Sequence, residues 1–124
     1  MWHFRVWYYP LKAYYHVYMK GRKKYLLDWK KQVDRVGGIR NVTAKIRRIA
    51  TPDDCDYNMH LSNSCYAKNG DAVRMELAIN AFSPIFTPGT YMAMGASHYV
   101  FFKEIPIGSE YVMEARLGGW GEKW

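Results

Sequence analysis

The sequence has few cysteines and no long apolar run. Its 124 residues contain 2 cysteines, Cys55 and Cys65, so nothing in it resembles the disulfide framework of a small secreted scaffold. No stretch of 18 uncharged apolar residues occurs, which argues against an ordinary membrane-spanning helix. The first residues also show no signal peptide with a small-residue cleavage site. The expected location is therefore intracellular, either cytoplasmic or peripheral on a membrane.

Acidic residues are scarce in the first part of the chain. Residues 1–50 contain 13 Lys or Arg and 2 Asp or Glu, a balance of +11, whereas residues 51–124 contain 5 and 9, a balance of −4. Aromatic residues also crowd residues 1–20. This composition is typical of a segment at an anionic membrane surface, although a helix packed on the domain is the alternative. Nucleic acid is a less favoured partner because no known binding motif accompanies the charge.

Residues 1–39 form the expected basic, aromatic N-terminal helical segment, and hydrophobic periodicity predicts a mixture of helices and strands along the chain. Asn69-Gly70 falls within the longest expected helix, and close packing against a sheet would explain the missing side chain of Gly70. The expected elements are a short helix at 26–36, a strand at 42–49, a mostly buried helix from 62 or 63 to 82, and strands at 91–103 and 110–117.

Three polar side chains before the long helix suggest hydrolytic chemistry. Asp56 can activate water as a general base, or attack a carbonyl as a nucleophile. Asn58 and His60 can orient that water or the carbonyl. The structural alternatives are a turn-capping Asp56, a turn residue at Asn58 and a hydrogen-bonding His60 beside the helix start.

The start of the long helix is a candidate oxyanion site. Its first backbone N–H groups, near Asn63, Ser64 and Cys65, have no partner within the helix and can stabilise a negatively charged intermediate. Asn63 is also a good helix cap, which is its simpler role. Cys65 is a less favoured nucleophile because no base is clearly placed for it. No zinc-type spacing links Cys55, His60 and Cys65, so no metal site is expected.

These residues resemble a known family. The pattern Asp-x-Asn-x-His-x-x-Asn-x-x-Tyr, from Asp56 to Tyr66, is similar to the signature of hotdog-fold thioesterases, including acyl-carrier-protein and 4-hydroxybenzoyl-CoA types. The longer run at residues 52–64 resembles most closely the eukaryotic group around thioesterase superfamily member six, and residues 98–106 and 119–124 resemble it too. The resemblance covers residues 40–124.

The resemblance implies an α+β hotdog fold, in which a curved antiparallel sheet wraps a long central helix. It implies a homodimer and an acyl-CoA or acyl-carrier thioester as substrate, with coenzyme A as part of that substrate and no other cofactor. Asp56 is then the first candidate for catalysis, followed by Asn58 and His60, with Asp71 on the helix as a second acid. The family pattern continues beyond Trp124, so the chain is expected to lack the last strands.

Two further helix residues are candidates for substrate binding. Tyr66 and Arg74 are expected near the thioester, Arg74 against coenzyme phosphate. The alternatives are a core position for Tyr66, a solvated helix face for Arg74, and a surface ion pair for Asp71. The function predicted is acyl-thioester hydrolysis; because a fold alone does not establish an enzyme, the alternative is a non-catalytic acyl-binding or membrane-associated hotdog protein.

Overall fold

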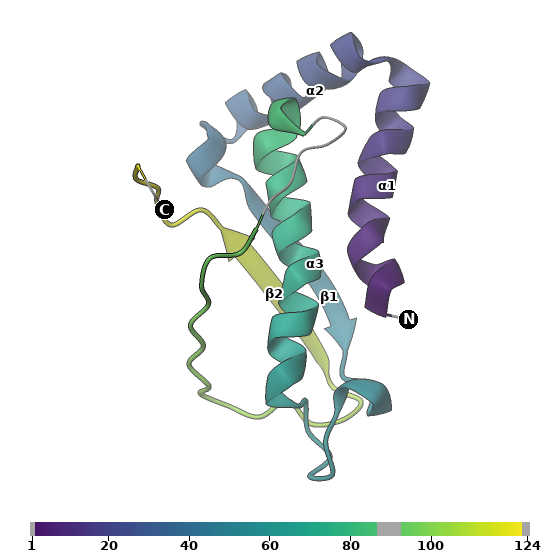
Figure 1. Ribbon diagram of the computed structural model, residues 1–124, viewed down its shortest axis with the longest axis vertical. Coiled ribbons are helices and arrows are strands. Elements are labelled where there is room, and N and C mark those ends of the chain that lie inside the picture. The colour runs from purple at the N-terminus through teal and green to yellow at the C-terminus, as the bar shows by residue number, and fades with distance from the viewer. Residues whose placement is uncertain (1, 87–92, 123–124) are drawn as a thin grey trace.

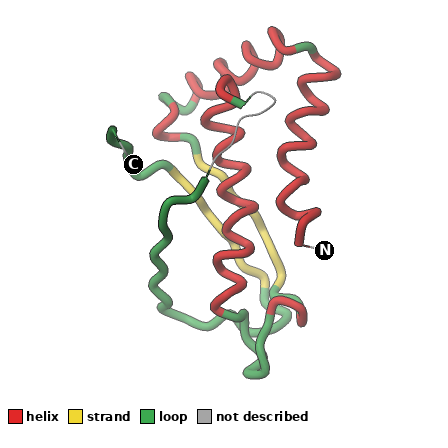
Figure 2. Tube along the Cα trace, in the orientation of Figure 1, coloured by secondary structure: helices red, strands yellow, loops and turns green. Residues whose placement is uncertain are grey.

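A long helix packed against a two-stranded antiparallel sheet forms the centre of the computed structural model, which describes residues 2–86 and 93–122 (Figures 1 and 2). Two further helices precede this unit and cover part of the long helix. The helices and strands in chain order are α1 (Trp2–Lys20), α2 (Arg22–Arg35), β1 (Thr43–Ile49), α3 (Asn63–Phe82) and β2 (Glu110–Arg116).

The sheet pairs β1 with β2 in an uninterrupted antiparallel register from Thr43 opposite Arg116 to Ile49 opposite Glu110. Ala44 and Ile46 face inward and are buried, as the alternating pattern predicted. The alternation continues to the strand end, where Arg48 is half-buried on the inner face and Ile49 is exposed. Two cross-strand ion pairs, Lys45–Glu114 and Arg47–Glu110, lie on the outer face.

Helix α3 carries the core. Ser62 precedes its first residue, and the helix extends to Phe82, as the sequence predicted. Its buried side chains recur at three- and four-residue steps, which aligns them on the faces toward the sheet and α1. They are Cys65, Asn69, Ala72, Val73, Leu77, Ala78 and Ala81. The α+β class is therefore confirmed, and a long helix against an antiparallel sheet is the arrangement expected of the hotdog fold.

The N-terminal segment forms two helices joined at Gly21. The expected helix at 26–36 is confirmed as α2, which begins earlier, at Arg22, and is followed by Gly37 in the left-handed region (φ 82°). The Trp29 indole donates a hydrogen bond to the Asn80 carbonyl (2.8 Å), and Tyr25 bonds to Ser83 (2.7 Å), so α2 is tied to the end of α3. Within the described residues, no helix has the length and apolarity needed to cross a membrane. The domain division at residue 39 stays a prediction.

The strand expected at 91–103 is wrong over residues 93–103; residues 91–92 lie outside the described part. Residues 93–103 form no strand, and among the described residues they make no backbone–backbone hydrogen bond. The segment is rich in β-forming residues, but such residues make a strand only where a neighbouring strand completes the ladder. Here the segment passes along the outside of the molecule, and Phe102 is 93% exposed (Figure 1).

The explanation expected for Gly70 is also wrong. Gly70 does lie on the side of α3 toward β2, but an added Cβ would meet Met113 Cε at 3.9 Å and Arg74 Nη1 at 4.0 Å, which are ordinary contact distances. No backbone approaches closely enough to require a missing side chain. The structure gives no packing reason for the glycine.

Candidate functional site

The loop between β1 and α3 is closed on itself and tied to the segment before β2. Cys55 and Leu61 form an isolated antiparallel bridge, which closes a short hairpin around residues 56–60. The Leu61 N–H donates to the Ile105 carbonyl and the Ile107 N–H to the Met59 carbonyl, both at 2.8 Å. Met59 is the one described residue other than glycine with a positive φ, at 64°. These constraints hold residues 56–60 in one fixed conformation, which we call the closed turn.

Asp56 and His60 face each other inside this turn. Asp56 Oδ1 lies 3.4 Å from His60 Nδ1 and accepts the Asn58 backbone N–H at 2.9 Å. The two side chains are 29% and 22% exposed, so both are shielded yet reachable. On the other side of the imidazole, Nε2 lies 4.0 Å from the Glu104 carboxylate, which is mostly exposed. The bond to Asn58 is the turn-capping role foreseen as the alternative for Asp56, and it leaves the second carboxylate oxygen available.

The start of α3 follows directly after this turn and offers two backbone donors. The Cys65 N–H donates to the Ser62 carbonyl at 2.8 Å, so it is already occupied. The Asn63 and Ser64 N–H groups have no acceptor among the described residues, and both residues are exposed. Ser62 is the N-cap residue but does not cap with its side chain, since its hydroxyl lies 3.1 Å from the Ser64 hydroxyl. Two adjacent free amides at a helix start can bind a developing negative charge.

The remaining candidates lie further along α3. Asp71 is about two turns beyond the helix start, where it forms an ion pair with Arg74. That pairing is the alternative weighed for Asp71, whereas a solvated helix face was the alternative for Arg74. About 12 Å of helix separates Asp71 from the helix start. Tyr66 packs edge-on against Phe101, with ring centroids 5.1 Å apart, and burial raises the pKa of its hydroxyl.

A mostly apolar cavity of about 250 Å³ opens between the first half of α3 and β2. Tyr66, Asn69 and Val73 form its helix side, and Tyr111 and Met113 are among its β2 side chains. Leu61, which directly follows the closed turn, also lines it. The closed turn and the cavity are therefore adjacent, which suits a ligand with a polar reacting group and an apolar tail.

A buried polar cluster beside the turn was missed by the sequence analysis. Asp54 is 1% exposed and accepts from Lys68 Nζ (2.6 Å) and Asn69 Nδ2 (3.2 Å). The Asn69 amide lies 3.0 Å from the Tyr111 hydroxyl as well. The signal available in the sequence was Asn69 itself, a polar residue four positions after Cys65 on the buried side of the helix.

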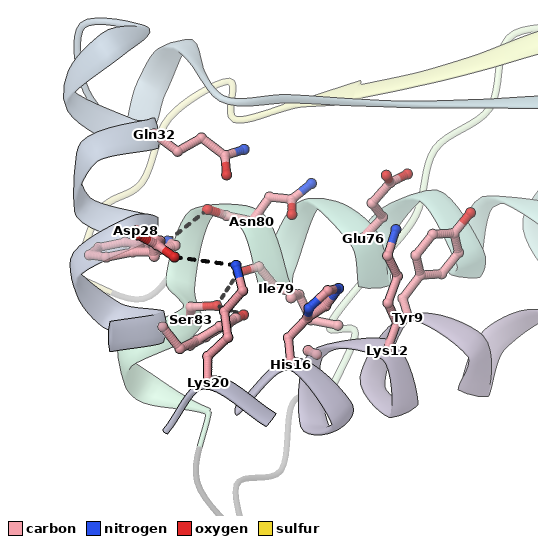
Figure 3. Close-up of a pocket in the computed structure, with 13 residues that line it drawn as sticks. Tyr9, Lys12, His16, Lys20, Asp28, Gln32, Glu76, Ile79, Asn80 and Ser83 are labelled. Atoms are coloured by element: carbon pink, nitrogen blue, oxygen red, sulfur yellow. Dashed lines mark hydrogen bonds and ion pairs between the residues drawn. The ribbon is translucent and has the colours of Figure 1, made fainter. Parts of the chain in front are cut away.

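A second cavity, of about 230 Å³, lies between α1, α2 and α3 (Figure 3). It shares no lining residue with the cavity between α3 and β2. Lys12, His16 and Lys20 extend from α1 on one side, and Lys20 pairs with Asp28 of α2 at 3.3 Å. Glu76 of α3 lines the opposite side. Its Oε2 atom is buried and has no hydrogen-bond partner among the described residues, and burial raises the pKa of this carboxyl.

Replacing Glu76 with Gln is expected to stabilise the fold at neutral pH by roughly 1 kcal/mol, because a half-buried carboxylate is replaced by a neutral amide. Since the folded pKa is raised, the destabilisation is absent below the ordinary glutamate value of about 4.3. It develops as pH rises through that value and is complete above the raised folded pKa. Urea unfolding of both proteins between about pH 4 and pH 7 measures this difference. Glu122→Gln, at an exposed position, is the control; a Glu76→Gln effect independent of pH would contradict the prediction.

The two cysteines are free, Cys65 buried and Cys55 half-buried. Burial is also the main reason that the pKa of the Cys55 thiol is raised, and neighbouring carboxylates act in the same direction. Within residues 2–86 and 93–122, no group of three or more His, Cys, Asp or Glu gathers as a metal site would require.

Comparison with known proteins adds to this geometry. The family model described as the Thioesterase-like superfamily matches residues 50–124, which include the closed turn, α3 and β2. A curated relative, the probable thioesterase atnL of Emericella nidulans, is 27% identical over 92 residues, covering 57% of this chain and 30% of that protein. The chain therefore spans less than a third of the length of the curated relative it matches. No solved structure matches it significantly. The chain belongs to the thioesterase-like superfamily.

Proposed function

We propose that the protein hydrolyses an acyl thioester at the junction of the closed turn and α3. The observation that carries the proposal is the half-buried Asp56–His60 pair at 3.4 Å, in a turn that leads directly to a helix start with two free amides. A thioester hydrolase needs a group that activates water and donors for the oxyanion. The turn supplies the group that activates water, and the helix start supplies the donors for the oxyanion.

In this mechanism Asp56 acts as the general base. It takes a proton from a water molecule through the oxygen that is not bonded to Asn58, and His60 and Asn58 hold its orientation. The hydroxide attacks the thioester carbonyl carbon, and the Asn63 and Ser64 N–H groups stabilise the oxyanion. The carbon–sulfur bond then breaks, and the proton passes to the thiolate. Direct attack by Asp56, through an anhydride that water then hydrolyses, is the alternative route.

We place the acyl chain in the adjacent cavity of about 250 Å³, whose mostly apolar lining includes Leu61 and Val73. The substrate class is an acyl-CoA or an acyl-carrier thioester. A homodimer, typical of the family resemblance, belongs to the proposal and is tested by analytical ultracentrifugation.

The direct test is thiol release from a series of acyl-CoAs, from acetyl to palmitoyl. Hydrolysis of any member above the rate without protein supports the proposal. The non-catalytic alternative is favoured by the bond that already engages Asp56 in the turn. If calorimetry shows acyl-CoA binding while no member of the series is hydrolysed, the protein is an acyl-binding module and the proposed hydrolysis is wrong.

A further inference from the structure

Helix α1 carries a row of large side chains on the face that no other described residue covers. Trp7, Leu11, Tyr14 and Tyr18 follow each other at steps of four, three and four residues, so they share one side of the helix. They are 59%, 61%, 70% and 77% exposed, and we call them the outer stripe. The opposite side of α1 packs toward α3 (Figure 1). Exposed side chains also flank the stripe: Tyr8, Tyr15 and Met19.

An outer stripe of this size marks a docking surface, because soluble proteins rarely leave a contiguous apolar patch in water. The segment that carries the outer stripe also has positive charge only. Residues 1–27 contain six Lys or Arg and no Asp or Glu. Arg22, Lys23 and Lys24 are exposed at the corner between α1 and α2, and within the described residues they form no ion pair.

This charge selects the partner. A second copy docking through the same stripe offers these cations no carboxylate from its own residues 1–27, which contain none. An anionic surface meets them with opposite charge. Tyr and Trp rings suit the headgroup level of a membrane, where one end of each ring is apolar and the other is wet. Leu11 and Met19 add aliphatic contact with the acyl chains below.

We propose that α1 docks on an anionic membrane surface, with the outer stripe in the headgroup region and the cations at the α1–α2 corner against lipid phosphates and carboxylates. The helix then lies parallel to the membrane, as amphipathic interfacial helices do. This inference does not depend on thioester hydrolysis, since it uses neither the closed turn nor the cavity beside it.

Flotation of the full chain with lipid vesicles tests the proposal. One set of vesicles is phosphatidylcholine, and the other is a mixture of phosphatidylcholine and phosphatidylserine. We expect the protein to float with the mixed vesicles, to stay unbound with phosphatidylcholine alone, and to be released by raising the salt concentration. Equal binding to both vesicle types, or to neither, would overturn the proposal.

Two variants separate the apolar and charged parts. Leu11→Ser combined with Tyr14→Ser and Tyr18→Ser should weaken binding at least tenfold, since it removes exposed apolar contact without touching the core. Lys23→Glu with Lys24→Glu should weaken it more than tenfold, at about fivefold or more for each lost cation. Phe102→Ser and Lys103→Glu, on an exposed segment elsewhere, are the matched controls and should float like the original chain.

The other occupants give different results. If the protein does not float but forms a dimer that the serine variant converts to a monomer, the stripe binds a second copy. If an RNA or DNA duplex binds at low salt and competes fully with the vesicles, the cations serve nucleic acid. Either result would overturn membrane docking. Circular dichroism of each variant checks that the helices remain folded, so a loss of flotation reports on the surface.

Discussion

Replacing Asp56 with Asn is expected to lower acyl-thioester hydrolysis by about two to four orders of magnitude, the usual contribution of a general base. The substitution keeps an oxygen that can accept the Asn58 N–H, so the turn should stay closed. It removes the proton acceptor, because an amide oxygen cannot take a proton from water at neutral pH. The rate of thiol release under saturating acyl-CoA, with circular dichroism as the check on folding, measures the effect.

Asp53→Asn is the matched control for this experiment. Asp53 is an exposed carboxylate in the same region, where its Oδ1 accepts the Thr51 hydroxyl. It should retain normal hydrolysis. His60→Gln should lower the rate less than Asp56→Asn, since it removes only an orienting partner. If His60→Gln abolishes hydrolysis while Asp56→Asn retains most of it, His60 is the base and the role assigned to Asp56 is wrong.

Replacing Asp54 with Ala is expected to reduce the free energy of unfolding by about 3 kcal/mol, the cost of breaking a buried ion pair from one side. Asp54 is the most buried carboxylate among the described residues, and it holds Lys68 and Asn69 of α3. Its backbone carbonyl also accepts the Ser62 N–H at 3.0 Å, so the residue fixes where α3 begins. Urea unfolding measures the loss, and Asp53→Ala should change stability by less than about 0.5 kcal/mol.

The Asp54–Lys68 pair also predicts how stability changes at high pH. The hydrogen bond to Asp54 raises the pKa of Lys68 in the fold. The stabilisation is therefore complete below the ordinary lysine value of about 10.4 and is lost as pH rises through the raised folded value. Lys68→Met should remove this alkaline loss. If the original chain and Lys68→Met lose stability in parallel above that pH, the pair does not contribute as stated.

The main elements follow from local signals that the sequence contains. Alternation from Val42 to Arg47 predicted one strand, and the stripe from Tyr66 to Ala81 predicted the long helix, because these patterns match the period of each structure. The same reasoning predicted a strand over residues 93–103, and that prediction was wrong. Its aromatic residues have strand propensity, but a strand exists only with a neighbour to bond, and propensity carries no information about a neighbour.

The candidate site was predictable only in its local part. Asp56, Asn58 and His60 lie within five residues, so the sequence alone places them together. The choice of Asp54 as the buried carboxylate, instead of Asp53 or Asp56, depends on Lys68 and Asn69 of α3, which lie further along the chain. The sequence alone does not distinguish these three aspartates from one another. Packing against residues further along the chain gives each of them a different environment. Asp71 is the opposite case. The family resemblance makes it a second candidate acid, but the structure places it in a local ion pair with Arg74.

The closed turn is bonded both to itself and to the segment before β2, which has a thermodynamic consequence for any ligand that binds there. The turn is held by the Cys55–Leu61 bridge and by the bonds of Met59 and Leu61 to the segment before β2, so its backbone has little freedom left to lose. A ligand meeting this turn spends little of its interaction energy on ordering the protein. For the proposed acyl thioester, affinity and its variation with chain length should then report mainly on the apolar tail in the neighbouring cavity, with the polar end contributing a nearly constant share.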